Sequence, residues 1–126
     1  MTGEITIKKD GNDYEVSVET QQYGTLELEE VELKGNDLSA NIDMQGATKQ
    51  HYIDMASTIK QQFGRLDGIL HNAGMLGVLT PFEQIEESTF DEVMKINVKA
   101  QLLMTQAVLP LILISDHGRI VFTSST

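Results

Sequence analysis

The stretches LDGILHNAG (66–74) and RIVFTSS (119–125) decide the fold of this chain. Each is a run of apolar and β-branched residues that ends in small or polar side chains, which is typical of a buried strand followed by a turn. Between them, apolar residues recur every three or four positions from residue 88 to 113, as in an amphipathic helix. Strand, helix and strand in this order predict a parallel βαβ unit with a right-handed crossover.

Residues 1–44 have a different, alternating pattern. Apolar and polar side chains alternate in four segments, which are separated by turn-forming sequences such as DGND (10–13) and KGND (34–37). This pattern predicts a four-stranded antiparallel meander with an acidic outer face, and the doubled Glu29-Glu30 predicts a β-bulge in its third strand. The expected fold class is therefore α/β, an α+β hybrid in which the meander precedes an α-β-α-β segment with a Rossmann-like βαβ unit. The two parts, 1–44 and 45–126, are expected to pack as one unit.

Two helices are expected in the second part. The first runs from residue 48 to 63, with apolar residues on one face and Gly64 as its C-cap. The second is expected to begin at a capping box formed by Ser88 and Asp91 and to be kinked near its end by Pro110. Its two apolar stripes predict burial on two sides, against the sheet and against something else, such as a second copy of the chain.

Composition limits the classes of function. The chain has 126 residues, a formal charge of −10 and no cysteine, so disulfides, thiolate metal sites and cysteine nucleophiles are excluded. The charge argues against nucleic acid and anionic membrane surfaces as partners. The most apolar run, 100–114, is interrupted and too short to span a bilayer, and no signal sequence is recognised, so a cytoplasmic protein is expected. The spacing of the three histidines predicts no metal site.

Small and polar residues fall where a βαβ unit binds its ligands. Asn72, Ala73 and Gly74 end the first strand, and Ser125 ends the second, so all are expected at the carboxyl ends of the strands. Asn97 lies within the helix, where a buried amide needs hydrogen-bond partners. Each position alone has a structural explanation: a strand-exit turn, the N-cap of a following helix, or a helix kink. Their combination, in this order and spacing, favours a ligand site.

The sequences HNAG (71–74), INV (96–98) and IVFTSS (120–125) resemble three motifs of the short-chain dehydrogenase/reductase superfamily, in the same order. The resemblance covers about residues 43–126 and leaves 1–42 unrecognised. It implies an oxidoreductase that transfers a hydride to or from NAD or NADP.

The resemblance also implies a role for each matching residue. Asp43 and the Met44 backbone would contact the adenine ring, and residues 72–74 would line the ribose and the nicotinamide. Asn97 would hold a water of the proton relay through its main chain. Ser125 would polarise the substrate carbonyl.

Two motifs of the superfamily are absent from these 126 residues: the glycine-rich TGxxxGxG turn and the Tyr-x-x-x-Lys pair. The sequence therefore predicts a catalytically inactive fragment or hybrid of a reductase. The alternative is a small acidic binding or scaffold module that uses the reductase-like part only as core. A third hypothesis is an intact reductase in which another chain supplies the tyrosine and lysine.

The fragment hypothesis makes a structural prediction. In the parent fold the strand at 66–71 pairs with a first strand that the sequence does not contain. Some strand of residues 4–44, or a second copy of the chain, should therefore cover the edge of that strand. Self-association is expected through the helix at 88–113 or through an open sheet edge.

Overall fold

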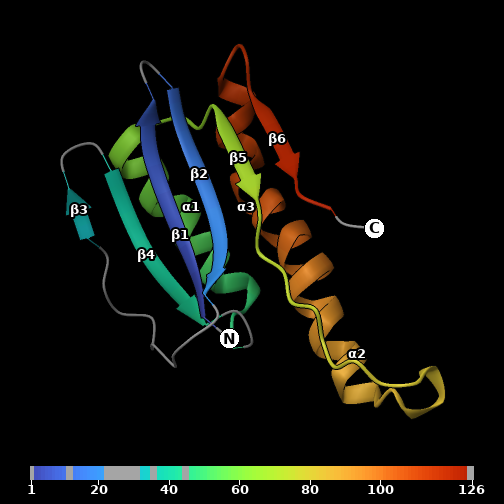
Figure 1. The fold of residues 1–126 in the computed structure, drawn as a ribbon. Helices are drawn as coiled ribbons and strands as arrows, with labels where there is room; N and C mark the ends of the chain where they lie inside the picture. The colour runs from blue at the N-terminus through green and yellow to red at the C-terminus, as the bar shows by residue number, and fades with distance from the viewer. Residues whose placement is uncertain (1, 11–12, 22–31, 35–36, 44–45, 125–126) are drawn as a thin grey trace.

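The computed structural model describes residues 2–10, 13–21, 32–34, 37–43 and 46–124. They form one six-stranded sheet and a layer of helices (Figure 1). The strands are β1 (Thr2–Asp10), β2 (Asp13–Gln21), β3 (Glu32–Lys34), β4 (Asp37–Asp43), β5 (Gly68–His71) and β6 (Arg119–Phe122). The helices are α1 (Lys49–Phe63), a 3₁₀ turn (Phe82–Gln84), α2 (Glu87–Met94), a π-helical segment (Lys95–Lys99) and α3 (Ala100–Ile114).

The strand order is β3-β4-β1-β2-β5-β6, which is not the order of a meander. β1 pairs antiparallel with β2 and with β4, and β3 pairs with β4, whereas β2 pairs parallel with β5 and β5 with β6. The predicted meander is therefore wrong. β4 pairs with β1 on the side away from β2, and the other edge of β2 pairs with β5. The strands β4, β2, β5 and β6 all run in one direction. The predicted bulge at 29–30 lies outside the described residues.

The pairing of β2 with β5 confirms that an early strand covers the edge of the strand at 66–71. The register runs from Glu15 opposite Gly68 to Val18 opposite His71. One further backbone bond extends the ladder, because the Asp67 N–H donates to the Tyr14 carbonyl oxygen at 2.9 Å. The parallel β5–α–β6 unit is confirmed as well. The sheet is thus continuous across the boundary between the two parts of the chain.

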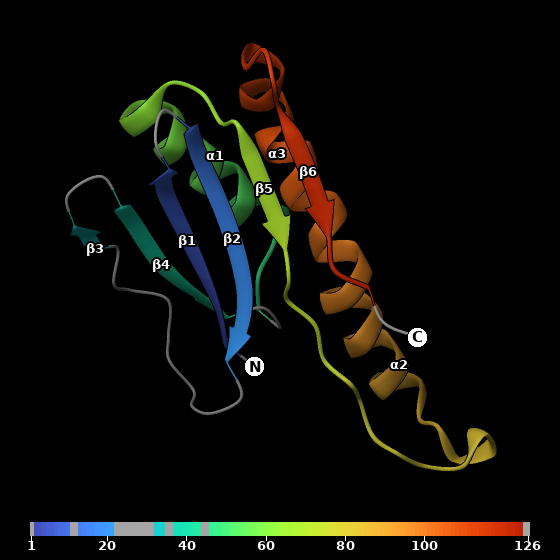
Figure 2. The same ribbon diagram turned by 45° about the horizontal axis from the view of Figure 1, so that its top comes forward.

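α1 and α3 cover one face of the sheet, as Figures 1 and 2 show. Alternation along each strand places every second side chain on this face. The middle row of the sheet supplies Ile7, Val16 and Ile69, and the helices and connecting segments supply the rest of the core. Its buried members on the helices include Tyr52, Ala56, Ile59, Ile96, Ala100, Met104, Val108, Leu111 and Ile112.

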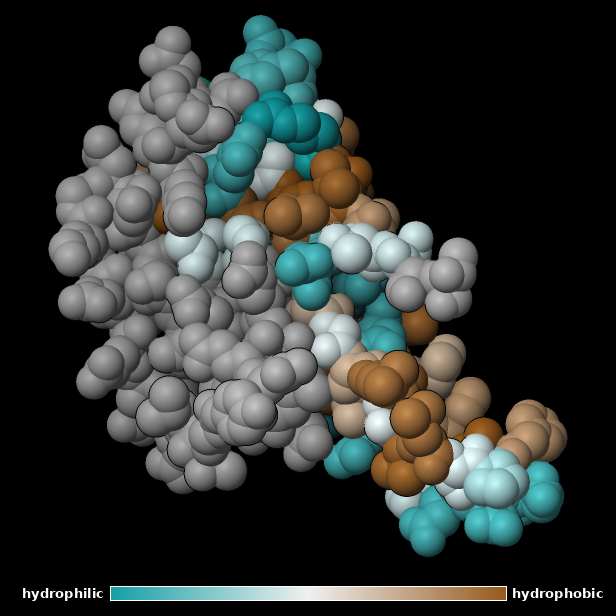
Figure 3. All heavy atoms as spheres, in the orientation of Figure 1, coloured by the Kyte–Doolittle hydropathy of each residue, from teal (hydrophilic) through white to brown (hydrophobic). Residues whose placement is uncertain are grey.

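The opposite face of β5 and β6 is uncovered, and apolar residues show there in Figure 3. Leu70 and Val121 lie opposite each other on this face and are 37% and 49% exposed. In the neighbouring row the Arg119 side chain passes over Gly68 and pairs with Glu15. A Cβ at Gly68 would lie 3.3 Å from Arg119 Cγ, so glycine leaves the space in which this ion pair lies.

α1 begins and ends where the sequence predicts. Its N-cap is Thr48, whose N–H donates to His51 Nδ1 at 2.9 Å. Its C-cap is Gly64, in the left-handed conformation at φ 80° that glycine adopts without steric cost.

The second helix is longer than the sequence suggests. It begins at Glu87 after the N-cap Glu86, which makes no side-chain cap, so the predicted capping box is wrong. It continues through Pro110 to Ile114. By length and composition the helix from Glu87 to Ile114 is apolar enough to cross a membrane, although 33% of its apolar 18-residue window is buried in the protein. A single such helix is weak evidence, because the core helix of a soluble protein passes the same test.

The loop between β5 and α2 extends away from the sheet and carries apolar side chains, which gather at the lower right of Figure 3. Phe82 is 89% exposed. The other exposed apolar residues of this loop are Leu76, Val78, Leu79 and Ile85.

Candidate functional site

The strands that run in one direction bring their carboxyl ends to one edge of the sheet. β4 ends at Asp43, β5 at His71 and β6 at Phe122. In open sheets of this kind, ligands bind in the crevice beyond the carboxyl ends of the strands. We call this the carboxyl edge.

Residues 72–74 leave β5 at the carboxyl edge. The Asn72 side chain is exposed, whereas Ala73 is buried against the core. A Cβ at Gly74 would have Asn97 Oδ1 at 3.5 Å, which is an ordinary contact. Local packing therefore does not require glycine at this position. An open backbone here lets another group approach closely.

Asn97 holds the chain that follows Gly74. Its Oδ1 accepts a hydrogen bond from the Met75 N–H at 2.8 Å, and its Nδ2 donates to the Met75 carbonyl at 2.9 Å. It lies in the π-helical segment, where the Ala100 N–H reaches back five residues to the Lys95 carbonyl. Single π-turns inside α-helices occur frequently at functional sites. The structure thus places the Asn97 side chain beside Met75, the residue after 72–74, and the ligand contacts of these residues stay predictions.

Of the remaining predicted site residues, the structure describes only some. The backbone of Asp43 lies at the carboxyl edge, opposite Thr2 of β1. Three strand spacings separate β4 from β5, about 14 Å in all. Met44 and Ser125 lie outside the described residues, so their contacts with the site stay predictions.

His71 lies beneath the carboxyl edge, on the helix side of the sheet, and is 1% exposed. Its Nε2 is 2.9 Å from Thr105 Oγ1 on α3, and its ring stacks on Phe122 at 4.9 Å between centroids. Its Nδ1 is buried without a hydrogen-bond partner. Burial lowers the pKa of this imidazole from 6.5 to about 4, so His71 is neutral at pH 7.

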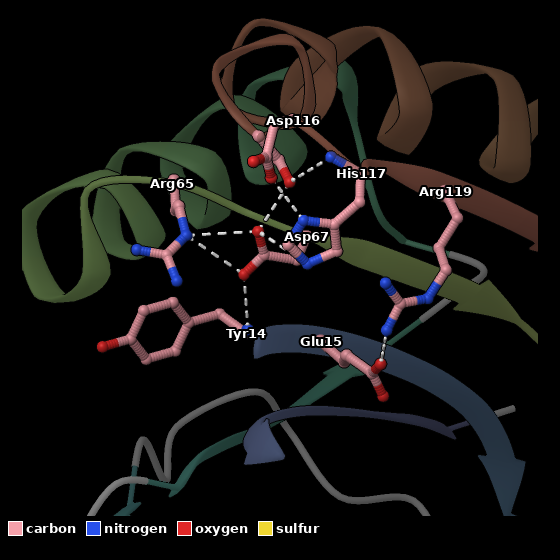
Figure 4. A network of polar contacts seen from close by, with 8 residues as sticks. Tyr14, Glu15, Arg65, Asp67, Asp116, His117 and Arg119 are labelled. Carbon is pink, nitrogen blue, oxygen red and sulfur yellow. Dashed lines mark hydrogen bonds and ion pairs between the residues drawn. The ribbon is translucent and has the colours of Figure 1, made fainter. Parts of the chain in front are cut away.

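The sequence analysis missed a second polar cluster, at the opposite edge of the sheet (Figure 4). Its centre is Asp67, which has no exposed surface. The carboxylate accepts hydrogen bonds from the Ser115 hydroxyl at 2.6 Å, the Tyr14 N–H at 2.8 Å and Arg65 Nε at 3.1 Å. His117 Nε2 lies 3.8 Å away.

Two opposing effects set the pKa of Asp67. Burial alone would raise it, but the hydrogen bonds from Ser115, Tyr14 and Arg65 together hold it below its ordinary value. The carboxylate therefore joins the start of β2, the start of β5 and the turn before β6. The only signal in the sequence was a charged residue inside the apolar run LDGIL.

Among the described residues no group of histidine, cysteine, aspartate or glutamate side chains could hold a metal ion.

Comparisons with known proteins agree on one family. A sequence model described as short chain dehydrogenase matches residues 8–126, which extends the resemblance into β1. The protein "Uncharacterized oxidoreductase YciK" of Escherichia coli is 42% identical over 85 residues, which make up 68% of this chain and 34% of that protein. The chain thus spans about a third of the length of this relative.

Solved structures give the same result. A putative short chain dehydrogenase from Pseudomonas syringae is 44% identical, with a TM-score of 0.65 over 67% of this chain and 34% of that one. A Shigella flexneri short chain dehydrogenase complexed with NADP is also 44% identical, with a TM-score of 0.63 over 67% of this chain and 35% of that one.

Proposed function

Because the chain belongs to the short-chain dehydrogenase family, we propose that its carboxyl edge binds the nicotinamide side of an NADP(H)-type cofactor. The observation that carries this proposal is the contact between Asn97 and Met75. It fixes the path of the chain just after residues 72–74, where the resemblance puts the ribose and the nicotinamide.

The described residues fit part of such a cofactor. The exposed Asn72 amide can exchange hydrogen bonds with a ribose, and Gly74 has no side chain to keep a flat ring away. No glycine-rich turn precedes them in the sequence, so a pyrophosphate has no cradle of the family's kind. We therefore expect weak binding, with a Kd on the order of a millimolar.

The choice of NADP over NAD rests on relatives. The Shigella flexneri structure is complexed with NADP, and a 43% identical Escherichia coli structure is complexed with NADPH. Asp43 is proposed to lie at the adenine end of the cofactor, and Met44 beside it.

Hydride transfer is the activity proposed for a whole protein that contains this chain. Asn97 would take part in the proton relay there, and Ser125 would orient the substrate carbonyl. The 126 residues contain no Tyr-x-x-x-Lys sequence, so we expect them to bind cofactor without turnover. When bound, the cofactor supplies the hydride.

A fluorescence titration with NADPH tests the proposal. We expect saturable binding that Gly74→Val abolishes, because the added side chain fills the space over the strand end. Ser88→Val is the matched control on the exposed start of α2 and should bind as the wild type does. Absence of binding at 10 millimolar, which is about tenfold above the expected Kd, would contradict the proposal and favour the binding or scaffold module.

We also propose that the exposed stripe of the long helix pairs with a second copy of the chain. The stripe recurs at helical spacing on one face, and Leu102 near its middle is 57% exposed. Its other members are Phe90, Met94, Val98, Leu109 and Leu113. A surface of this kind is typical of an interface with protein or lipid.

Sedimentation in buffer and binding to vesicles separate these two partners. Dimers that Leu102→Glu converts to monomers would support self-association, whereas monomers that bind vesicles would contradict it. A cytoplasmic location stays a prediction.

A further inference from the structure

β6 is the last strand at one end of the sheet, and its outer edge is open. The N–H groups of Arg119 and Thr123 donate to carbonyl oxygens on the β5 side. Successive residues of a strand turn their backbone groups to opposite edges, so Ile120 and Phe122 direct theirs outward. Neither makes a backbone hydrogen bond on that side with any residue that the structure describes. Each therefore offers one donor and one acceptor to a further strand.

This edge lacks the features that protect edge strands from pairing, which include short length, charged side chains and proline. β3, at the other end of the sheet, is three residues long and has Glu32 and Lys34 at its ends. β6 contains neither proline nor lysine, and its one charged residue, Arg119, pairs with Glu15 over the face of the sheet. Val121 is apolar and exposed. The edge of β6 is thus suited to pairing with another strand.

The distribution of charge favours a second copy of the chain as the partner. The chain has a net charge of −10, and most of its acidic residues lie in residues 1–43. These residues form the strands at the other end of the sheet, whereas α3, which lies under β5 and β6, contains no charged residue (Figure 1). Two copies that meet through β6 and α3 therefore keep their acidic parts apart. A basic partner would find no carboxylate on α3 or β6.

We propose that two copies of the chain pair through β6, antiparallel, about a two-fold axis at Val121. Ile120 of each copy then exchanges both backbone hydrogen bonds with Phe122 of the other, and the two Val121 residues face each other. On the uncovered face Leu70 and Val121 of both copies form one apolar stripe. The inference rests on the proposed pairing of the exposed helix stripe, and it adds the strands that join with it.

The same axis brings the two α3 helices together. Leu103 and Ala107 line a cavity with residues of α1, whereas Leu102 and Leu109 lie on the side of α3 away from α1 and are exposed. That side faces the end of the sheet at which β6 lies (Figures 1 and 2). Strands are about 4.8 Å apart, so a helix under β5 and β6 lies about 5 Å from the axis. The two helices are then about 10 Å apart, a distance at which helices pack.

The level of the axis along α3 also fits. Thr105 contacts the last residue of β5, which pairs with the last residue of β6, and Ile112 lies against the turn just before β6. The level of Val121 therefore falls between Thr105 and Ile112. Leu102 and Leu113 lie on either side of this level at similar distances. In the antiparallel pair, Leu102 of each copy packs on Leu113 of the other, and both are exposed in the single chain.

An isotope-filtered NOESY spectrum tests the strand pairing. Labelled and unlabelled chains are mixed in denaturant and refolded together, and sedimentation should show dimers. We expect contacts between the Hα atoms of Val121 in the two copies, which lie opposite each other in the closer type of antiparallel pair. The amides of Ile120 and Phe122 should exchange at least about tenfold more slowly in the wild type than in Leu102→Glu, which separates the copies.

The outcomes separate this inference from the proposed helix pairing. Dimers that show no contact between the Val121 residues and fast exchange at Ile120 and Phe122 would overturn the inference and leave the helix pairing intact. Monomers would contradict both. Monomers whose β6 amides become protected only on vesicles of neutral lipid would assign the surface to a membrane, and would likewise overturn the inference.

A charge placed at the axis provides a second test. Val121→Lys puts two ammonium groups opposite each other and should raise the dissociation constant of the dimer at least about tenfold. Ser17→Lys adds the same charge to the same face of the sheet, but on β2, two strands from the edge. It should change the dissociation constant less than about twofold. Equal effects of the two substitutions, in variants that circular dichroism shows to be folded, would overturn the inference.

Discussion

His71 and Asp67 are the two buried polar residues that anchor β5, one at each end of the strand. They differ in the contacts that offset the cost of burying a polar group. His71 is neutral, stacks on Phe122 and leaves Nδ1 without a partner, whereas Asp67 is charged and accepts hydrogen bonds from three directions. Each therefore makes the stability of the chain depend on pH, in a different range.

The first prediction concerns His71. Its pKa of about 4 in the folded chain lies below the ordinary 6.5, so between these values the unfolded chain binds one more proton. The stabilisation is complete above pH 6.5 and is lost as the pH falls toward 4. Denaturant unfolding should show a loss of about 3 kcal/mol over this range.

His71→Asn tests the assignment, because asparagine does not titrate. Its free energy of unfolding should lack this dependence between pH 6.5 and 4. His51→Gln removes an exposed imidazole and should keep it. If the free energy of unfolding of His71→Asn fell between pH 6.5 and 4 as that of the wild type does, the pH dependence could not be assigned to His71.

The second prediction concerns Asp67. Asp67→Asn removes the charge that Ser115, Tyr14 and Arg65 stabilise, and it should lower the free energy of unfolding by about 3 kcal/mol at pH 7. Because the folded pKa is lowered, this contribution is present above the unfolded pKa of about 3.9 and is lost as the pH falls through the folded value. Asp116→Asn, at an exposed position, should change the free energy of unfolding much less than Asp67→Asn does. If the two substitutions lowered the free energy of unfolding equally, the buried hydrogen bonds of Asp67 would not explain its contribution to stability.

At the scale of elements, the contact between the π-helical segment and the loop after β5 matters most. Asn97 is the one side chain of that segment with two hydrogen bonds to the Met75 backbone. The loop beyond it carries exposed apolar residues and extends from the sheet. Asn97 therefore fixes where the strand exit stops and the extended loop begins.

The third prediction follows from this contact. Asn97→Ala should speed hydrogen exchange at the Met75 amide about tenfold or more, because the amide loses its acceptor. Exchange in α1 should change little. Asn72→Ala, which removes the exposed amide directly after β5, is the control and should leave the Met75 amide protected. Unchanged exchange in Asn97→Ala would show that the loop is held by other contacts.

Which elements could be predicted depended on the range of their interactions. The helix at 49–63 and the βαβ unit follow from local periodicity and from Gly64, and the structure confirms both. The contact of Asn97 with Met75 could not be predicted, because periodicity places Asn97 in a helix without giving the partners of its amide. The start of α2 could not be predicted either, since Glu86 provides no side-chain cap and the helix begins without the expected signal.

At the scale of the whole molecule, the strand order was the main error. Alternation between apolar and polar residues defines strands but not their neighbours, and hairpin turns favour a sequential order. In the observed order β4 lies beside β1, and β2 pairs with β5, a contact between residues more than fifty positions apart. The Asp67 cluster was missed for the same reason, since Ser115 and Tyr14 are distant in sequence.

The place of β2 has a functional consequence. It gives the sheet four strands of one direction, and these place Asp43 and Asn72 at the same edge. The pairing of β2 with β5 joins β5 and β6 to the strands of the first part, so that the ends of β4 and β5 lie at the same edge of one sheet. The proposed cofactor contacts thus depend on this one pairing.

A three-dimensional NOESY spectrum of the labelled chain tests this pairing most directly. The account predicts backbone contacts of the parallel type that link Val16 and Ser17 with Ile69 and Leu70. Backbone contacts between β2 and β3, together with none between β2 and β5, would support the sequential strand order of a meander and contradict the strand order described above.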